Sequence, residues 1–320
     1  MNELKKYLQL FKKIRIDRSH GLAPHKPILL LSVLQLYHSK LIIDRRVFIT
    51  PELVALFKAN WTSLVKTNHD CRISYPFYYL KSDKFWKLVP KAGFENIDQM
   101  GSIMKSFSNL NTAIDYAIID TGLFSLFVNK QSNEILQHFL IDEFFPEFNS
   151  DLTYLSSSQQ NLFVNIEGKI LYEPPAEYRK EIEKLMHQNN QEEIYLRGSL
   201  FKREIPKIYR NTCSISGMKV DSVFSFSMID ACHIIPFSNS YNDTVTNGIA
   251  LCPNLHRAFD RGLISIDSNY KVLVSQSFRE DITNYSIKTF AGRELHLPIN
   301  ESFYPSLSNI EWHRNNIFKP

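Results

Sequence analysis

The sequence has few of the features that mark secreted, membrane-bound or zinc-stapled proteins. Its 320 residues include four cysteines, and none of them stands in a C-x-x-C pair. Disulfide-rich domains and structural zinc sites depend on closely spaced cysteines, so we expect neither of them here. Isolated thiols favour a reducing compartment, and we therefore expect the protein in the cytoplasm.

Long apolar segments are missing as well. The longest apolar stretch, residues 28–36, is interrupted by Ser32 and Gln35, and it is far shorter than the ~20 residues of a membrane span. The first residues, Met-Asn-Glu-Leu-Lys-Lys, lack the apolar core of a signal peptide. We therefore expect no membrane partner.

The overall composition is that of a globular protein, and its net positive charge is compatible with an anionic partner. Hydrophobic residues make up 44% of the chain and charged residues 22%, which is the usual balance for a folded domain. The length allows two domains, each with a core of its own. The net charge of +4 fits a nucleic acid, but net charge steers association without identifying the partner.

Polarity and turn residues divide the chain into three parts. Residues 1–150 alternate expected helices with short strands, so we expect a mixed α/β domain. Residues 151–191 are polar and contain the pair Pro174-Pro175, which predicts a linker region with one helix. Residues 192–320 form the third part, and the fold class that we expect for the whole chain is α+β.

Hydrophobic periodicity predicts the elements of each part. In the first part we expect helices over 1–17, 28–38, 51–60, 110–121 and 132–145, a short strand within 41–50, and a hairpin made of 72–80 and 85–89. In the remainder we expect helices over 177–187 and 196–209 and strands over 223–229 and 264–274. Asn254 is expected to cap a further helix, which carries His256.

The most informative feature is a spaced trio of polar residues in the third part. His233 lies in Asp-Ala-Cys-His-Ile-Ile-Pro (230–236), and Asn247 and His256 lie in the segment 246–262. The pattern indicates a histidine at the end of a strand, an asparagine in a loop and a histidine on a helix. A single histidine in a strand is more often structural, but this ordered set is hard to obtain by chance.

These residue types suit the hydrolysis of a phosphodiester. A neutral histidine is a suitable base for water near pH 7, which favours His233 for that role. His256 is a candidate metal ligand, and Asp260 follows four residues later on the same helix face. Asp230, shortly before His233, is a further candidate ligand. A divalent ion held by such groups acts as a Lewis acid on the phosphate.

Residues 197–274 resemble the HNH nuclease family. The resemblance rests on Cys-x-x-Ser-Gly, Ala-x-His-Ile-x-Pro, Asn-Gly-x-x-Leu-Cys and His-x-x-Phe-Asp-x-Gly, in this order. It implies a ββα-metal finger that uses Mg²⁺ or Mn²⁺. It also implies that His233 is the general base, Asn247 the organiser of the loop and His256 a metal ligand, and as ligands we expect Asp230, His256 and Asp260.

Two positions depart from the pattern of many HNH proteins. Where those proteins carry a zinc-binding C-x-x-C pair, this chain has Cys213 and Ser216, so we expect no structural zinc. Many HNH sites place a carboxylate immediately before the base, and here that position is Cys232. We interpret Cys232 and Cys252 as small buried apolar residues.

The N-terminal part is similar to the sulfur-binding domain of phosphorothioate-dependent restriction endonucleases. The similarity rests on Ala-Pro-His-Lys-Pro-Ile-Leu-Leu-Leu (23–31), on Tyr-Pro-Phe-Tyr (75–78) and on Phe-Trp-Lys-Leu (85–88). Those proteins join such a domain to a C-terminal HNH domain, which is the order seen here. The resemblance implies that residues 1–150 bind modified DNA and that residues 192–320 cut it.

A reader of phosphorothioate needs an apolar pocket for sulfur and donors for the remaining phosphate oxygens. Phosphate contacts position a protein on DNA without reading its sequence. The candidates for the apolar pocket are Tyr75, Pro76 and Phe77. The candidates for the phosphate contacts are Arg18, His20, His25 and Lys26.

We therefore interpret the chain as a modification-dependent endonuclease that acts on double-stranded DNA carrying phosphorothioate. An HNH enzyme that reads another modification, or an unmodified sequence, is the nearest alternative. A DNA-binding protein whose finger has lost catalysis is a second alternative, suggested by Cys232. A homodimer is considered because one finger cuts one strand and a double-strand break needs two.

Overall fold

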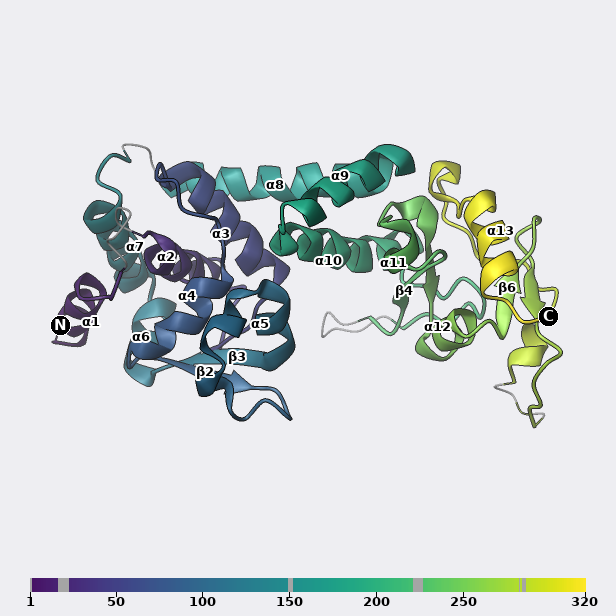
Figure 1. Ribbon diagram of the computed structural model, residues 1–320, viewed down its shortest axis with the longest axis horizontal. Coiled ribbons are helices and arrows are strands. Elements are labelled where there is room, and N and C mark those ends of the chain that lie inside the picture. The colour runs from purple at the N-terminus through teal and green to yellow at the C-terminus, as the bar shows by residue number, and fades with distance from the viewer. Residues whose placement is uncertain (1, 17–22, 149–151, 221–226, 282, 284–285) are drawn as a thin grey trace. The chain divides into compact units, whose positions relative to one another are not determined.

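The structure is a computed structural model, and it describes residues 2–16, 23–148, 152–220, 227–281, 283 and 286–320. The chain divides into two compact units, Met1–Val164 and Asn165–Pro320. Figure 1 shows both units and labels most of their helices and strands. Among the described residues, none of the helices combines the length and apolar character needed to cross a membrane.

The first unit contains a three-stranded antiparallel sheet with helices packed around it (Figure 1). Its strands are β1 (Arg46–Val47), β2 (Trp86–Pro90) and β3 (Ile114–Ile119), in the order β1-β3-β2. Its helices are α1 (Asn2–Lys12), α2 (His25–His38), α3 (Pro51–Leu64), α4 (Ser74–Tyr79), α5 (Phe107–Ala113), α6 (Thr121–Val128) and α7 (Lys130–Phe144). Val47 and Leu88 both lie opposite Ala117, in the middle of β3.

Helix α2 is the core of this unit. Ile28, Leu29, Leu30 and Leu31 are fully buried, because α3, α4, α6 and α7 pack around the helix. Apolar residues on all sides suit a helix that is enclosed on all sides. Pro27 lies in the first turn, where its missing N–H removes no hydrogen bond of the helix. The predicted core helix is confirmed and begins earlier, at His25.

Two element predictions for the first unit are wrong. The sequence predicts the segment 72–80 as a strand of a hairpin, because aromatic residues favour strands. The segment contains α4 instead, and burial of Phe77 and Tyr78 on the core side outweighs that preference. The sequence also predicts a helix over 110–121, but α5 ends at Ala113 and β3 follows. The isoleucines of β3 fit the centre of a sheet, and β3 is the strand that pairs with β2.

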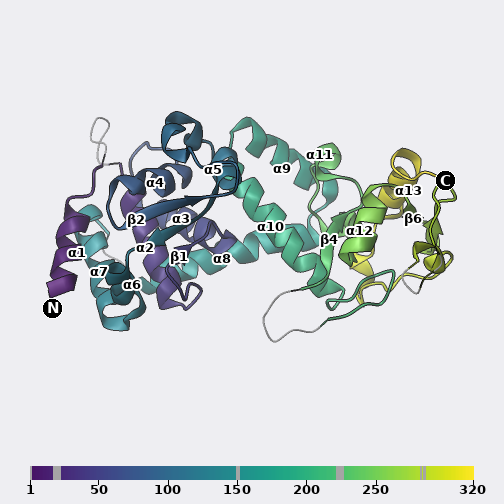
Figure 2. The same cartoon turned by 90° about the horizontal axis from the view of Figure 1, so that it is seen from below.

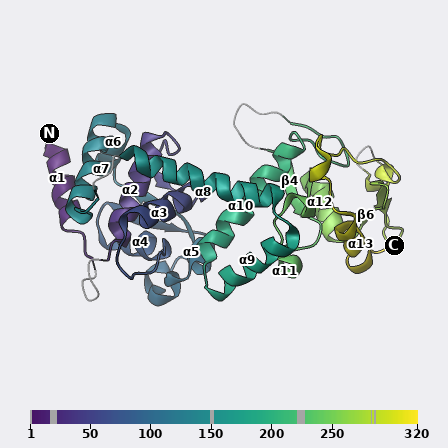
Figure 3. The ribbon, with the colours of Figure 1, turned by 90° about the horizontal axis from the view of Figure 1, so that it is seen from above.

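The second unit begins within α8 (Leu152–Tyr172). Its further helices are α9 (Pro175–His187), α10 (Gln191–Ile208), α11 (Phe237–Ser240), α12 (Pro253–Asp260) and α13 (Leu307–Asn316), and its strands are β4 (Asp230–His233), β5 (Gly248–Leu251), β6 (Ile264–Ile266) and β7 (Val272–Val274). Helices α9 and α10 pack against each other (Figure 3). Where the sequence predicts one helix between residues 151 and 191, the structure has two, α8 and α9.

The centre of the second unit is a ββα arrangement. Strands β4 and β5 pair antiparallel, with His233 opposite Gly248, and α12 follows directly and lies beside β4 (Figure 2). Helix α10 packs on the other side of this pair. A side chain at Gly248 would overlap Ile205 and Phe201 of α10, so glycine permits the close approach of this helix.

Three smaller predictions for this unit need correction. Most of the strand expected over 223–229 lies outside the described residues, and the described residues 227–229 are not in a strand. Asn254 does not cap α12, because the cap position is Cys252 and Pro253 is the first helical residue. The strand expected over 264–274 is a hairpin of β6 and β7.

Candidate active site

His233 lies at the end of β4, in contact with a helix and a buried carboxylate. Its ring stacks on Phe201 of α10 with a centroid distance of 4.0 Å and an interplanar angle of 10°. Its Nε2 lies 2.9 Å from Oδ1 of Asp243. A carboxylate only accepts hydrogen bonds, so Nε2 carries the proton of this contact. In the neutral ring, Nδ1 is then the nitrogen with the lone pair.

Asp243 is a residue that sequence reasoning missed. It is 1% exposed, and Tyr178 of α9 donates a hydrogen bond to its other oxygen, Oδ2, over 3.3 Å. Burial raises the pKa of Tyr178 well above its ordinary value, so this hydroxyl stays a donor. Nothing in a single sequence distinguishes Asp243 from the aspartates that are common in polar turns.

The environment of Tyr178 extends this network through α9 and α10. The guanidinium of Arg197 lies over the Tyr178 ring, 5.2 Å from its centroid. Arg197 is fully buried and forms ion pairs with Glu181 and Glu193 at 3.0 and 3.2 Å. The surroundings of His233 therefore depend on two helices that precede the ββα arrangement.

Asn247 is fully buried and joins both ends of the loop that follows His233. Its Oδ1 accepts from the backbone N–H of Ile235 at 3.0 Å. Its Nδ2 donates to the backbone oxygens of Ile235 and Asn242, each at 3.0 Å. Asn309 of α13 donates a further bond to Oδ1, at 3.2 Å. This side chain therefore fixes the loop between β4 and β5 without adding charge.

His256, on α12, lies between two carboxylates. Its Nδ1 is 3.2 Å from Oδ2 of Asp230, and its Nε2 is 3.5 Å from Oδ2 of Asp260. A neutral imidazole has one N–H, so it satisfies one of these carboxylates and turns a lone pair toward the other. A cation among these three groups relieves that repulsion. The arrangement therefore suits a divalent metal ion.

Cys232 adds a sulfur atom to this cluster. Its side chain is fully buried, as expected, but its Sγ lies 3.8 Å from Oδ1 of Asp260. One ligand atom from each of Cys232, His256 and Asp260 lies within 4.8 Å of the others. With Asp230, the cluster offers oxygen, nitrogen and sulfur donors, a set that divalent transition ions accept.

A pocket of about 340 Å³ connects the base and the cluster. His233, His256 and Asp260 line it together with Pro236 and Phe237. The structure thus brings four predicted site residues, Asp230, His233, His256 and Asp260, to one region. Asn247 holds the loop that follows His233.

His313 of α13 also lines this pocket, but its ring is occupied by structural contacts. Its ring stacks on Phe259 at 3.7 Å, and its two nitrogens contact the Phe259 carbonyl oxygen and the Ser265 hydroxyl. Burial lowers its pKa to about 4, so the ring is neutral near pH 7.

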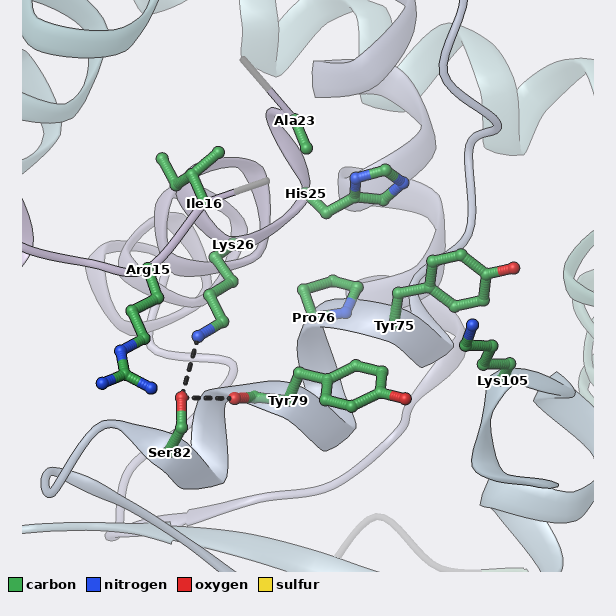
Figure 4. A pocket seen from close by; sticks show the side chains of 10 residues that line it. All are labelled: Arg15, Ile16, Ala23, His25, Lys26, Tyr75, Pro76, Tyr79, Ser82 and Lys105. Carbon is green, nitrogen blue, oxygen red and sulfur yellow. Dashed lines mark hydrogen bonds between the residues drawn. The ribbon is translucent and has the colours of Figure 1, made fainter. Parts of the chain in front are cut away.

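The first unit contains a separate pocket of about 430 Å³, shown in Figure 4. Four of the predicted DNA-binding residues line it, namely His25, Lys26, Tyr75 and Pro76. The N-terminal turn of α2 carries the first two and α4 carries the others. Residues that are far apart in the sequence therefore share one concave surface.

His25 forms a neutral, aromatic part of this pocket. Its ring packs against Trp61 and Tyr75, with centroid distances of 4.6 and 5.7 Å, and its Nε2 donates to the backbone oxygen of Asp70 over 2.9 Å. Burial lowers the pKa of His25 to about 4. It therefore brings no positive charge to a phosphate near neutral pH.

The charge of Lys26 is already balanced. Its ammonium lies 2.7 Å from Oδ2 of Asp83 and 3.1 Å from Oγ of Ser82, and the side chain is buried. Arg15 and Lys105, which sequence reasoning missed, supply exposed cations at opposite sides of the pocket (Figure 4). Both residues lie outside the sequence motifs from which the DNA-binding residues were predicted.

The remaining predicted DNA-binding residues do not line this pocket. Phe77 is fully buried and packs edge-on against Trp86 at 5.3 Å, so it belongs to the core. Arg18 and His20 lie outside the described residues. Tyr79, one helical turn after Tyr75 and Pro76, occupies the position on the pocket wall that was expected for Phe77.

Comparison with known proteins supports the assignment as an enzyme. Residues 213–267 match the family model described as HNH endonuclease, which is less than half of the chain. A solved structure of a protein named "Modification dependent TagI restriction endonuclease" is similar to 37% of this chain over 37% of its own, with 21% identity and a TM-score of 0.28. That likeness is too weak to bear on the target. None of the curated proteins matches the chain.

The family match includes β4, β5 and α12 with His233, Asn247 and His256. The C-terminal part of the chain thus contains an HNH endonuclease domain, which supports the predicted assignment as an endonuclease.

Proposed function

We propose that the protein is a restriction endonuclease that binds phosphorothioate-modified double-stranded DNA through its first unit and cuts a phosphodiester bond with its second. The observation that carries the cutting is that His233, His256 and Asp260 line one pocket, with Asp230 in contact with His256. The boundaries that we propose for the functional parts are residues 1–150, 151–191 and 192–320.

In this proposal His233 is the general base. Nε2 is held by Asp243, so Nδ1 takes the proton from the attacking water. The carboxylate of Asp243 then stabilises the imidazolium that forms, and the stacked ring of Phe201 keeps its plane fixed. Asp243 and Phe201 are positioning residues, because they act through His233.

Asp230, His256 and Asp260 would hold a divalent ion, Mg²⁺ or Mn²⁺ in the simplest case. When bound, such an ion neutralises the growing charge on the phosphate and stabilises the leaving oxygen. Asn247 keeps the loop after His233 in place, so that base and ligands keep their separation.

The pocket of the first unit supports the choice of target. Replacing a non-bridging phosphate oxygen by sulfur keeps the charge and makes that face larger and less hydrated. The pocket offers a matching surface, with Tyr75, Pro76 and Tyr79 as an apolar wall. In this proposal Arg15 and Lys105, which line the pocket on opposite sides, contact the phosphate oxygens. Neutral His25 lies beside the wall and avoids burying a charge against sulfur.

The target is tested by a gel-shift comparison of matched duplexes, with and without a single phosphorothioate of each configuration. We expect tighter binding of one modified duplex at the same salt concentration, which must be fixed because phosphate contacts dominate affinity. Equal affinities would remove the sulfur hypothesis and leave an HNH enzyme that reads another modification or an unmodified sequence.

The cutting is tested with the same modified DNA in a plasmid and purified protein supplied with Mn²⁺. We expect cleavage by the wild type and none by His233→Ala, with DNA binding retained by the variant. A wild type that binds and never nicks DNA would favour the alternative of an inactive binding protein.

Sedimentation with and without DNA tests the proposed homodimer, since a double-strand cut needs two active sites.

A further inference from the structure

We propose that Cys232 is itself a ligand of the metal ion, and that its thiolate makes this site prefer borderline-soft ions such as Co²⁺ and Zn²⁺ over Mg²⁺. This inference rests on the proposed function, because it concerns the metal site of the same nuclease centre. It replaces the interpretation of Cys232 as an inert apolar residue.

The geometry of β4 places Cys232 on the ligand side of the strand. Side chains two residues apart point to the same face of a strand, so Asp230 and Cys232 share a face and His233 belongs to the other. Asp230 contacts His256 on that face at 3.2 Å. The sulfur of Cys232 therefore points to the imidazole and carboxylate cluster and not to the base.

The distances allow one ion to reach sulfur, nitrogen and oxygen together. Ligand atoms of Cys232, His256 and Asp260 lie within 4.8 Å of one another. Ligands bound at about 2.0–2.3 Å around one tetrahedral ion are separated by less than twice that length, so small side-chain movements suffice. The Cys232 thiol already contacts Asp260, with 3.8 Å between Sγ and Oδ1.

The donor set decides the choice of ion. Magnesium demands oxygen ligands in near-octahedral geometry, whereas thiolate and imidazole suit zinc and cobalt. On binding, the Sγ–H bond breaks, the proton leaves to solvent and a metal–sulfur bond forms, with no change of oxidation state. Because Cys232 is fully buried, the resulting bond is shielded from water.

Titration with Co²⁺ in the absence of DNA tests this proposal. We expect one Co²⁺ per chain and the intense sulfur-to-cobalt charge-transfer absorption of a thiolate complex. Cys232→Ala should lose this absorption and bind Co²⁺ at least about tenfold more weakly. Cys252→Ser is the matched control. Cys252 is a second buried cysteine of this domain and does not belong to the cluster of Cys232, His256 and Asp260, so its removal should leave the absorption in place.

A second variant measures the preference between ions. Cys232→Asp supplies an oxygen ligand in place of sulfur. The dissociation constant for Mg²⁺ divided by that for Co²⁺ should therefore be at least about tenfold lower than in wild type. An unchanged ratio contradicts the proposal. If Cys232→Ala does not fold, X-ray absorption of the zinc-loaded wild type decides, because a thiolate ligand gives a sulfur shell at about 2.3 Å.

The outcomes separate this proposal from the proposed function. Stoichiometric Co²⁺ without charge-transfer absorption, or absorption that persists in Cys232→Ala, overturns the role of Cys232. Cleavage with Mn²⁺ would still support the nuclease in that case. Conversely, a thiolate spectrum in a protein that never cuts DNA upholds the ligand and contradicts the nuclease.

Discussion

Oδ1 of Asp243 lies 2.9 Å from Nε2 of His233, and its carboxylate is 1% exposed. The residue comes from the loop between β4 and β5, and Tyr178 of α9 supports its second oxygen. A buried carboxylate beside a histidine fixes the position of the ring proton. The candidate base is therefore oriented by groups both inside and outside the segment that matches the HNH family.

Asp243→Asn should lower the cleavage rate by about 100-fold or more. The amide keeps the shape of the side chain but loses the charge that stabilises the imidazolium, and it can turn an N–H toward His233 and force the wrong tautomer. Single-turnover cleavage of saturating DNA measures the effect. Asp115→Asn, at an exposed position of β3, is the control, and an equal loss in both variants would contradict the role of Asp243.

Asn247→Ala should reduce the free energy of unfolding by about 3 kcal/mol, because it leaves the part-buried N–H of Ile235 and nearby carbonyl groups without their partner. Urea unfolding measures this loss. Asn239→Ala, in the same loop but exposed, should change it by less than about 0.5 kcal/mol. Similar values for the two variants would show that Asn247 does not hold the loop.

The sequence predicted the HNH domain of the second unit better than the secondary structure of the first unit. The order of His233, Asn247 and His256 resembles the HNH family, and that resemblance implied the ββα arrangement that the structure contains. By contrast, α4 and β3 were mistaken for a strand and a helix, since tertiary burial outweighed the preferences of their residues.

Side-chain partners could not be predicted for the same reason. Lys26 was expected to contact phosphate, but its partner Asp83 lies 57 residues away in the sequence. Asp243, Arg15 and Lys105 became visible only when the fold brought separate segments together. Long-range ion pairs and pocket walls depend on packing that no local pattern encodes.

Arg15→Gln and Lys105→Gln should each weaken DNA binding several-fold and reduce the slope of log K against log salt by about one unit, because each removes one phosphate contact. The loss should be the same for modified and unmodified duplexes. Lys130→Gln, an exposed cation of α7, serves as the control. A slope unchanged from wild type would exclude the changed residue from the DNA contact.

Pro76→Ala should act on the modification and not on overall affinity. It removes two methylene groups from the pocket wall, which at about 0.8 kcal/mol each lowers the preference for phosphorothioate by up to about 15-fold. Binding of the unmodified duplex should stay within a factor of two or so, since no charge is lost. If the variant keeps the wild-type preference for the modified duplex, the phosphorothioate sulfur does not pack against Pro76.

Acidification should destabilise both units through His25 and His313. Burial lowers both pKa values from 6.5 to about 4. Between these values the unfolded chain takes up a proton at each histidine and the folded chain does not, so the free energy of unfolding falls as the pH falls from about 6.5 to 4. Above this window the two groups contribute no pH dependence. The loss approaches about 3 kcal/mol for each group.

Urea unfolding at pH 7 and pH 4.5 measures this acid sensitivity. His25→Gln and His313→Gln should each flatten the pH dependence of the unit that carries the change, because glutamine keeps a polar side chain but takes up no proton in this range. A pH dependence unaltered in both variants would assign the acid sensitivity to other groups.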